Sequence, residues 1–108
     1  FCYIHIKETD VPGHDNKPLE KKAFLELIDK IFFKELKEYI EKNKIKLIVT
    51  GDHSTPCKFK THTSDDVPVL FYNPEETGDS LTFGETNCRR GSLGKIYGIN
   101  LLKKTDFV

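Results

Sequence analysis

The stretch "IVTGDHSTP", residues 48–56, joins an apolar run to an acidic residue and a histidine. Residues 45–50 are nearly all apolar, which is typical of a short strand covered on both faces. Gly51 ends this run, and Asp52 and His53 follow it directly. The stretch therefore predicts a buried strand with two potential ligand residues at its carboxyl end.

The sequence before this stretch predicts a strand, a loop and a long helix. Residues 1–7 are rich in aromatic and β-branched side chains, as strands are, and residues 8–17 have the composition of a loop. Pro18 suits a first helical turn, and from there to Asn43 the apolar residues recur at helical spacing. A strand–helix–strand order favours a right-handed parallel crossover. We therefore expect an α/β fold with a mostly parallel sheet flanked by helices.

The second half of the chain contains one more predicted strand and two short helices. The strand covers residues 67–72, and Pro68 belongs to its first residues or to a sheet edge. A surface turn region follows at residues 73–82. The two helices are expected at residues 83–88 and 93–103.

The composition excludes several classes of protein. Hydrophobic residues make up 37% and charged residues 31%, which fits a soluble globular chain, and the 17 basic and 17 acidic residues give no net charge. Neither a nucleic-acid partner nor a membrane partner is therefore expected. The three cysteines lack C-x-x-C spacing, which favours a reducing cytoplasm over a disulfide framework. No methionine is present, and the chain opens inside a predicted strand, so we expect a piece of a longer protein.

Two acid–histidine pairs and one further histidine lie in predicted loops. Asp10 stands four residues before His14, Asp52 directly precedes His53, and His62 follows nine residues later. Ligands of an open α/β sheet collect at the carboxyl ends of its strands, so we expect both pairs at one edge with His62 in reach. Carboxylate and imidazole together suit Zn, Mn, Fe or Co.

Each of these residues taken alone is more often a solvated loop residue or a turn cap. Together they favour a metal site, with one ion or with two ions about 4 Å apart that clamp a transferred phosphoryl group. Pro12 and Gly13 are expected to bend the backbone so that Asp10 and His14 face one ion without a helix. His5, among apolar residues of a predicted strand, is expected in the core or behind a ligand.

Three segments resemble the C-terminal metal-binding segments of the alkaline phosphatase superfamily. They are "KETDVPGHD" (7–15), "VTGDHSTP" (49–56) and "KTHTSDDVPV" (60–69). Within that superfamily they are most similar to archaeal-type 2,3-bisphosphoglycerate-independent phosphoglycerate mutases, as is the tail "ETNCRRGSLGKIYGINLL" (85–102). The resemblance covers nearly the whole chain, residues 1–108, and implies part of an alkaline-phosphatase-like core.

The resemblance also implies a ligand set for two divalent ions. It assigns Asp10, His14 and His62 to one ion, and Asp52 and His53 to the other. Mixed oxygen and nitrogen ligands accept Mn, Zn, Co or Mg.

The activity implied is the interconversion of 2-phosphoglycerate and 3-phosphoglycerate through a phosphoserine, a step of glycolysis and gluconeogenesis. The family's serine nucleophile, a further aspartate ligand and the substrate-gripping domain have no counterpart here, and Ser54 is not at the nucleophile's position. We therefore expect the C-terminal part of a cytoplasmic mutase, inactive alone, with no particular oligomeric state predicted. The alternatives are a phosphatase, phosphodiesterase or phosphopentomutase of the same superfamily, or a metal-binding module without chemistry of its own.

Overall fold

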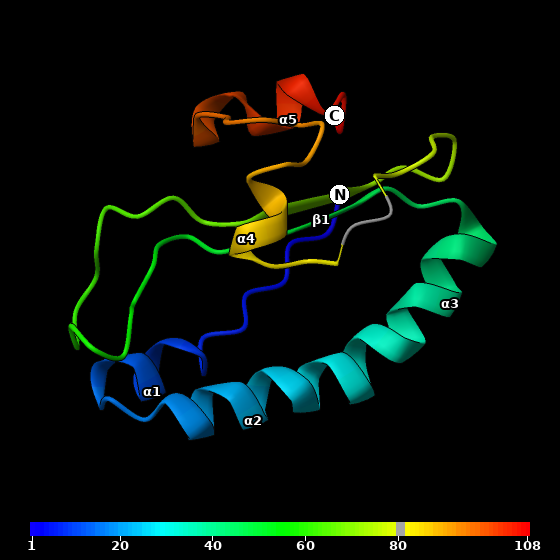
Figure 1. The fold of residues 1–108 in the computed structure, drawn as a ribbon. Coiled ribbons are helices and arrows are strands. Elements are labelled where there is room, and N and C mark those ends of the chain that lie inside the picture. Colours follow the sequence, from blue (N-terminus) through cyan, green and yellow to red (C-terminus); the bar gives the residue numbers. More distant parts are fainter. Residues whose placement is uncertain (80–81) are drawn as a thin grey trace. The chain divides into compact units, whose positions relative to one another are not determined.

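The computed structural model describes residues 1–79 and 82–108 (Figure 1). Its contacts divide the chain into two units. The first comprises residues 1–38 and 53–66, and the second comprises residues 39–52 and 67–108. Within the described residues, no helix is both long and apolar enough to cross a membrane.

The long helix predicted from Pro18 to Asn43 is confirmed, with an irregular middle. It consists of α2 (Pro18–Ile28), the π-helical turn η1 (Asp29–Phe33) and α3 (Lys34–Asn43). Pro18 occupies the first turn, where its missing N–H costs no helical hydrogen bond. The residue that follows the helix, Lys44, adopts a left-handed conformation with φ 52°.

The prediction of an irregular loop over residues 8–17 is wrong in part. The structure has a short helix there, α1 (Asp10–His14), which contacts α2. A proline in the first turn of a helix is tolerated, so Pro12 does not prevent it. Asn16 then adopts φ 53° and ends the helical geometry before α2 begins.

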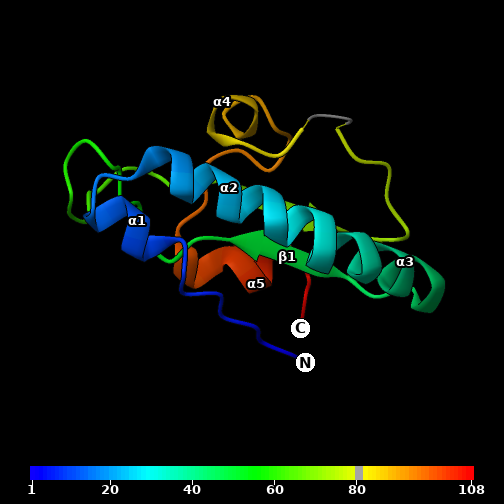
Figure 2. The ribbon, with the colours of Figure 1, turned by 90° about the horizontal axis from the view of Figure 1, so that it is seen from below.

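The predicted strand over residues 1–7 is not formed. Figure 2 shows this segment as an extended trace leading into α1, without helix or strand. Phe1 and Tyr3 are 86% and 77% exposed, and His5 is exposed rather than in a core. A strand needs a hydrogen-bonded neighbouring strand, and the two-stranded sheet that the described residues form does not include this segment. The predicted parallel crossover is therefore absent from the described chain, and a mostly parallel sheet is not confirmed.

The other two predicted strands form an antiparallel pair in the second unit. They are β1 (Leu47–Thr50) and β2 (Val69–Tyr72), in a register that runs from Leu47 opposite Tyr72 to Thr50 opposite Val69. Pro68 lies just before β2, and its carbonyl accepts a hydrogen bond from Thr50 Oγ1 at 3.0 Å. Most of β1 is half-buried, so the predicted covering of both faces is not complete.

The C-terminal part of the second unit is helical in short pieces. These are α4 (Glu85–Cys88), the 3₁₀ turn η2 (Gly98–Asn100) and α5 (Leu101–Lys104). The second predicted helix thus begins later than expected. Gly94 adopts φ 62°, which a helix from residue 93 would not allow. Of the predicted turn region at residues 73–82, positions 80 and 81 lie outside the described residues.

The described residues bury few apolar side chains. Ile40 of α3 is 6% exposed, and it is the one buried hydrophobic residue in the described part of the chain. Other apolar positions of the long helix, including Leu19 and Ile31 at 80% and 60% exposed, face solvent. The predicted apolar stripe is therefore present, but much of it is left uncovered by the described chain.

Candidate metal centre

Helix α1 presents an acid and an imidazole on one of its faces. Residues four apart in an α-helix are neighbours on its surface, and Asp10 and His14 have this spacing. His14 Nε2 lies 3.3 Å from Asp10 Oδ2. The one-turn helix, rather than a bend at Pro12 and Gly13, is what brings the two side chains together.

The loop of residues 53–66 folds back on itself and supplies the other imidazoles. Ser54 and Thr63 form an antiparallel bridge, with Thr63 N donating to Ser54 O at 3.0 Å. Alternate residues of an extended chain share a face, and directly opposed residues share one too. The bridge therefore turns His53, Thr55 and His62 to the same side, where the rings of His53 and His62 stack with centroids 3.6 Å apart.

Asp10, His14 and His62, hereafter the triad, have ligand atoms close enough to share one ion. His14 Nε2 lies 3.2 Å from His62 Nε2, and His62 Nε2 lies 3.5 Å from Asp10 Oδ1. Metal–nitrogen and metal–oxygen bonds of about 2.1 Å at tetrahedral angles put neighbouring ligand atoms about 3.4 Å apart. The spacing and the chemistry of the triad therefore fit a divalent ion such as Zn²⁺ or Mn²⁺.

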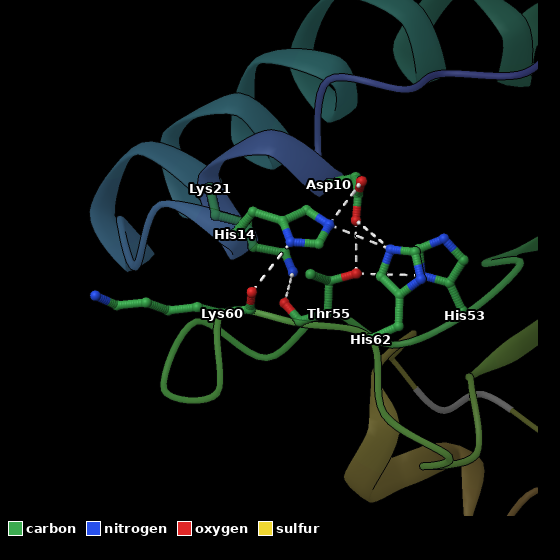
Figure 3. A network of polar contacts seen from close by, with 7 residues as sticks. All are labelled: Asp10, His14, Lys21, His53, Thr55, Lys60 and His62. Carbon is green, nitrogen blue, oxygen red and sulfur yellow. Dashed lines mark hydrogen bonds and ion pairs between the residues drawn. The ribbon is translucent and has the colours of Figure 1, made fainter.

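The orientation of the His14 ring is fixed by a backbone carbonyl. Its Nδ1 lies 3.1 Å from Lys60 O (Figure 3). A carbonyl oxygen can only accept a hydrogen bond, so Nδ1 carries the proton. The lone pair of the neutral ring then lies on Nε2, the nitrogen that faces the triad. Lys60 holds its carbonyl there in a left-handed conformation, φ 55°, which is uncommon for a residue other than glycine.

Thr55 connects the triad to His53. Its hydroxyl donates to Asp10 Oδ1 at 2.6 Å and lies 3.1 Å from His53 Nδ1 (Figure 3). Its carbonyl accepts a hydrogen bond from Lys21 Nζ at 2.9 Å. A β-carbon built on Gly13 would lie only 2.5 Å from the Thr55 carbonyl oxygen, so only glycine allows this approach of α1 to the loop.

These contacts also set the charge of the Asp10 carboxyl. The Thr55 hydroxyl is the main cause that keeps the pKa of Asp10 below its ordinary value, because it donates to the ionised form. Partial burial acts in the opposite direction, and the nearby imidazoles of His14, His62 and His53 add further lowering. Asp10 is therefore a carboxylate at neutral pH, as a metal ligand must be.

Four of the five predicted ligand residues come together in the first unit. Asp10, His14 and His62 form the triad, and His53 stacks beside it. These four residues form one cluster, whereas Asp52 belongs to the second unit. The assembly does not depend on the predicted edge of a parallel sheet, because a helix and a hairpin-like loop supply the side chains.

Sequence reasoning did not find the groups that orient these residues. They are the Thr55 hydroxyl, the Lys21 ammonium and the Lys60 carbonyl. A signal for the first of these was present, since Thr55 stands two residues after His53 and so shares its side of an extended chain. The other two depend on contacts across 34 and 46 residues, which no local pattern encodes.

The comparison with protein families defines the class. The sequence profile described as Metalloenzyme superfamily matches residues 1–104, so the chain belongs to that superfamily. Curated relatives at 36–42% identity over 94–95% of the chain are named 2,3-bisphosphoglycerate-independent phosphoglycerate mutase, one of them with the prefix "probable".

Three matches illustrate how far the likeness extends. A phosphoglycerate mutase of Pyrococcus horikoshii is 37% identical over 103 residues, and a probable one of Thermosipho africanus is 42% identical over 103 residues. Each match covers 94% of this chain and 25% of the relative, so the chain spans about a quarter of their length. A solved structure described as the PH0037 protein from Pyrococcus horikoshii superposes with a TM-score of 0.80 at 32% identity, covering 93% of this chain and 32% of the other.

Proposed function

We propose that this chain is the C-terminal, metal-binding part of a phosphoglycerate mutase that interconverts 2-phosphoglycerate and 3-phosphoglycerate through a phosphoserine. The triad carries the proposal, because two imidazoles and a carboxylate converge with the spacing of ligands around one divalent ion. The names of the relatives support the substrate, although the chain matches only a quarter of their length. The serine and the domain that grips the substrate would then belong to a preceding part of the protein, together with a mostly parallel sheet.

The ligand assignment has two parts. The triad would hold one ion, and His53 with Asp52 would contribute to a second. His14 is 41% and His62 is 50% exposed, so the triad remains open to an incoming ion and to a phosphoryl oxygen. The relatives' activity and the superfamily support divalent ions in general, and Mn, Zn, Co and Mg all remain compatible with the donors.

The residues of this chain would position charge rather than form covalent bonds. Bound divalent ions would neutralise the charge of the transferred phosphoryl group and lower the pKa of the attacking hydroxyl. The Asp10 carboxylate and the His14 imidazole would fix where that positive charge sits, since Thr55 and the Lys60 carbonyl hold them in place. Catalysis of phosphoryl transfer depends mainly on such positioning.

The test is an assay of the whole protein that carries this chain, supplied with 3-phosphoglycerate and a divalent metal. Phosphorus NMR distinguishes the three outcomes that matter. Signal at the 2-position supports the mutase, and free phosphate indicates a phosphatase of the same superfamily instead. Metal binding with no phosphoryl transfer on any phosphoglycerate would contradict the proposal and indicate a module without chemistry of its own.

A further inference from the structure

The Thr55 hydroxyl touches two side chains that the proposed function assigns to different ions. Its oxygen lies 2.6 Å from Asp10 Oδ1 and 3.1 Å from His53 Nδ1. A hydroxyl has one proton to donate, and here it goes to the carboxylate, which can only accept. Toward the imidazole the same oxygen must therefore accept, so the proton of this contact belongs to His53 Nδ1.

That proton count fixes the tautomer of His53. A neutral imidazole with its proton on Nδ1 carries its lone pair on Nε2, the nitrogen available for a metal bond. The Lys60 carbonyl imposes the same tautomer on His14. Both rings therefore have Nε2 free to bind a metal. The tautomer of His53 is fixed by a side-chain hydroxyl, and that of His14 by a backbone carbonyl.

The surroundings of Thr55 keep its hydroxyl in one place. The residue is 5% exposed, so bulk water competes little for the two hydrogen bonds. Lys21 Nζ holds its carbonyl at 2.9 Å, and the absence of a side chain at Gly13 lets α1 lie directly against it. A residue held in this way can fix the orientation of the ligand side chains that it contacts.

We propose that Thr55 is a positioning residue that couples the two halves of the metal centre, orienting the Asp10 carboxylate and fixing the His53 tautomer through one hydroxyl. The inference rests on the proposed function, because it takes Asp10 and His53 to be ligands. It predicts that loss of a single oxygen atom weakens binding of both ions together. A residue that served only the stability of the loop would not change the tautomer of a histidine.

The experiment compares Thr55→Val, which keeps the shape and removes the hydroxyl, with Thr55→Ser, which keeps the hydroxyl. The whole protein is stripped of metal and titrated with Mn²⁺ and with Zn²⁺ against a chromophoric chelator. Thr55→Val should bind both equivalents about 10–100-fold more weakly, the usual effect of losing a group behind a ligand. Thr55→Ser should recover most of that affinity. In the metal-free protein, ¹⁵N-labelled histidine spectra should show His53 protonated at Nδ1 in the wild type and in Thr55→Ser, but not uniformly in Thr55→Val.

Thr63→Val is the matched control, because it removes a hydroxyl from the same loop. The Thr63 hydroxyl donates a hydrogen bond to Asp65, which is not a residue of the cluster. Its affinity and its histidine spectra should match those of the wild type. Equal metal affinity of the wild type and Thr55→Val, or an Nε2-protonated His53 in the wild type, would overturn the coupling alone. A wild-type protein that binds neither ion would overturn the proposed function and the coupling with it. Circular dichroism of each variant excludes unfolding as the cause of lost binding.

Discussion

The ring of His14 donates its Nδ1 proton to the carbonyl of Lys60, which stands 46 residues further along the chain, at 3.1 Å. Lys60 keeps that carbonyl in place with a left-handed backbone, φ 55°. Such a conformation costs an L-residue about 1–2 kcal/mol, so the surrounding turn must enforce it. The turn does so with Phe59 N and Lys60 N both donating to the carbonyl of Pro56.

The conformation of Lys60 predicts opposite results for two substitutions. Lys60→Val places a β-branched side chain in a backbone conformation that such residues avoid even more than lysine does, and it should lower the free energy of unfolding by about a further 1 kcal/mol. Lys60→Gly fits the conformation and should change it by less than about 1 kcal/mol. Urea denaturation measures both. Equal losses for the two variants would mean that the backbone conformation at this position is not what matters.

Removal of a triad ligand should abolish tight metal binding. His14→Ala is expected to weaken binding of Mn²⁺ or Zn²⁺ by more than about 100-fold, since losing even a group behind a ligand costs about 10–100-fold. His5→Ala is the control, because His5 is exposed and outside the cluster. Metal content after dialysis, measured by elemental analysis, should fall only in the first variant. Full metal content in His14→Ala would show that the triad is not the site.

The close approach at Gly13 predicts a specific intolerance. An alanine β-carbon would stand 2.5 Å from the Thr55 carbonyl oxygen, a backbone atom that cannot move aside alone. Gly13→Ala should therefore cost about 1–3 kcal/mol of folding stability, as overpacking usually does, and should weaken metal binding as well. Gly78→Ala is the control, because an alanine there would meet no atom within 4 Å. Thermal melting of the two variants compares the positions directly.

The Asp79 carboxyl should make the stability of the fold depend on pH. Ser92 N donates to Asp79 Oδ2 at 2.8 Å, and this backbone hydrogen bond, with a further one from the Ser92 side chain, holds the pKa of Asp79 below its ordinary value. A carboxyl with a lowered pKa in the folded state stabilises folding at pH values above its unfolded pKa. That contribution disappears as the pH falls through the folded pKa.

Asp79→Asn tests this linkage. The wild type should be more stable than the variant at about pH 7, and the difference should shrink as the pH falls below the ordinary aspartate pKa of about 3.9 and the wild-type carboxyl becomes protonated. Because Asp79 is exposed, the expected difference is small, and paired denaturation curves at each pH are needed to measure it. A gap that stays constant between those pH values would mean that the carboxylate form is not what stabilises this turn.

The sequence carried enough information for the long helix and for two strands, because periodicity and apolar runs report local geometry. It could not show that β1 and β2 pair antiparallel, since an apolar run does not encode which neighbour a strand chooses. Asp10 and His14 were recognised as a pair, but Pro12 and Gly13 resembled a plain turn. Their helical spacing of four residues was the signal for α1, and the need for a glycine at position 13 appears only once Thr55 lies against it.

The sequence predicted which residues belong to the candidate site, but not how their side chains are placed relative to one another. The chain has only four histidines, few enough for the grouping of three of them with nearby acids to be noticed. Most of the contacts that orient them join residues far apart in the sequence, such as Thr55 with Asp10 and His14 with Lys60, and only the folded chain brings them together. Asp52 is the residue whose assignment still depends on its place in the sequence beside His53.

His14 and His62 stand 48 positions apart, and their Nε2 atoms lie 3.2 Å from each other. An ion held by both would act as a reversible cross-link that closes a loop of this length. By the chain-entropy estimate used for disulfides, closing such a loop lowers the conformational entropy of the unfolded chain, which stabilises the folded state by about 4 kcal/mol. The concentration of free metal around the protein would then determine the stability of this folded loop, so the same ion would contribute both to catalysis and to folding.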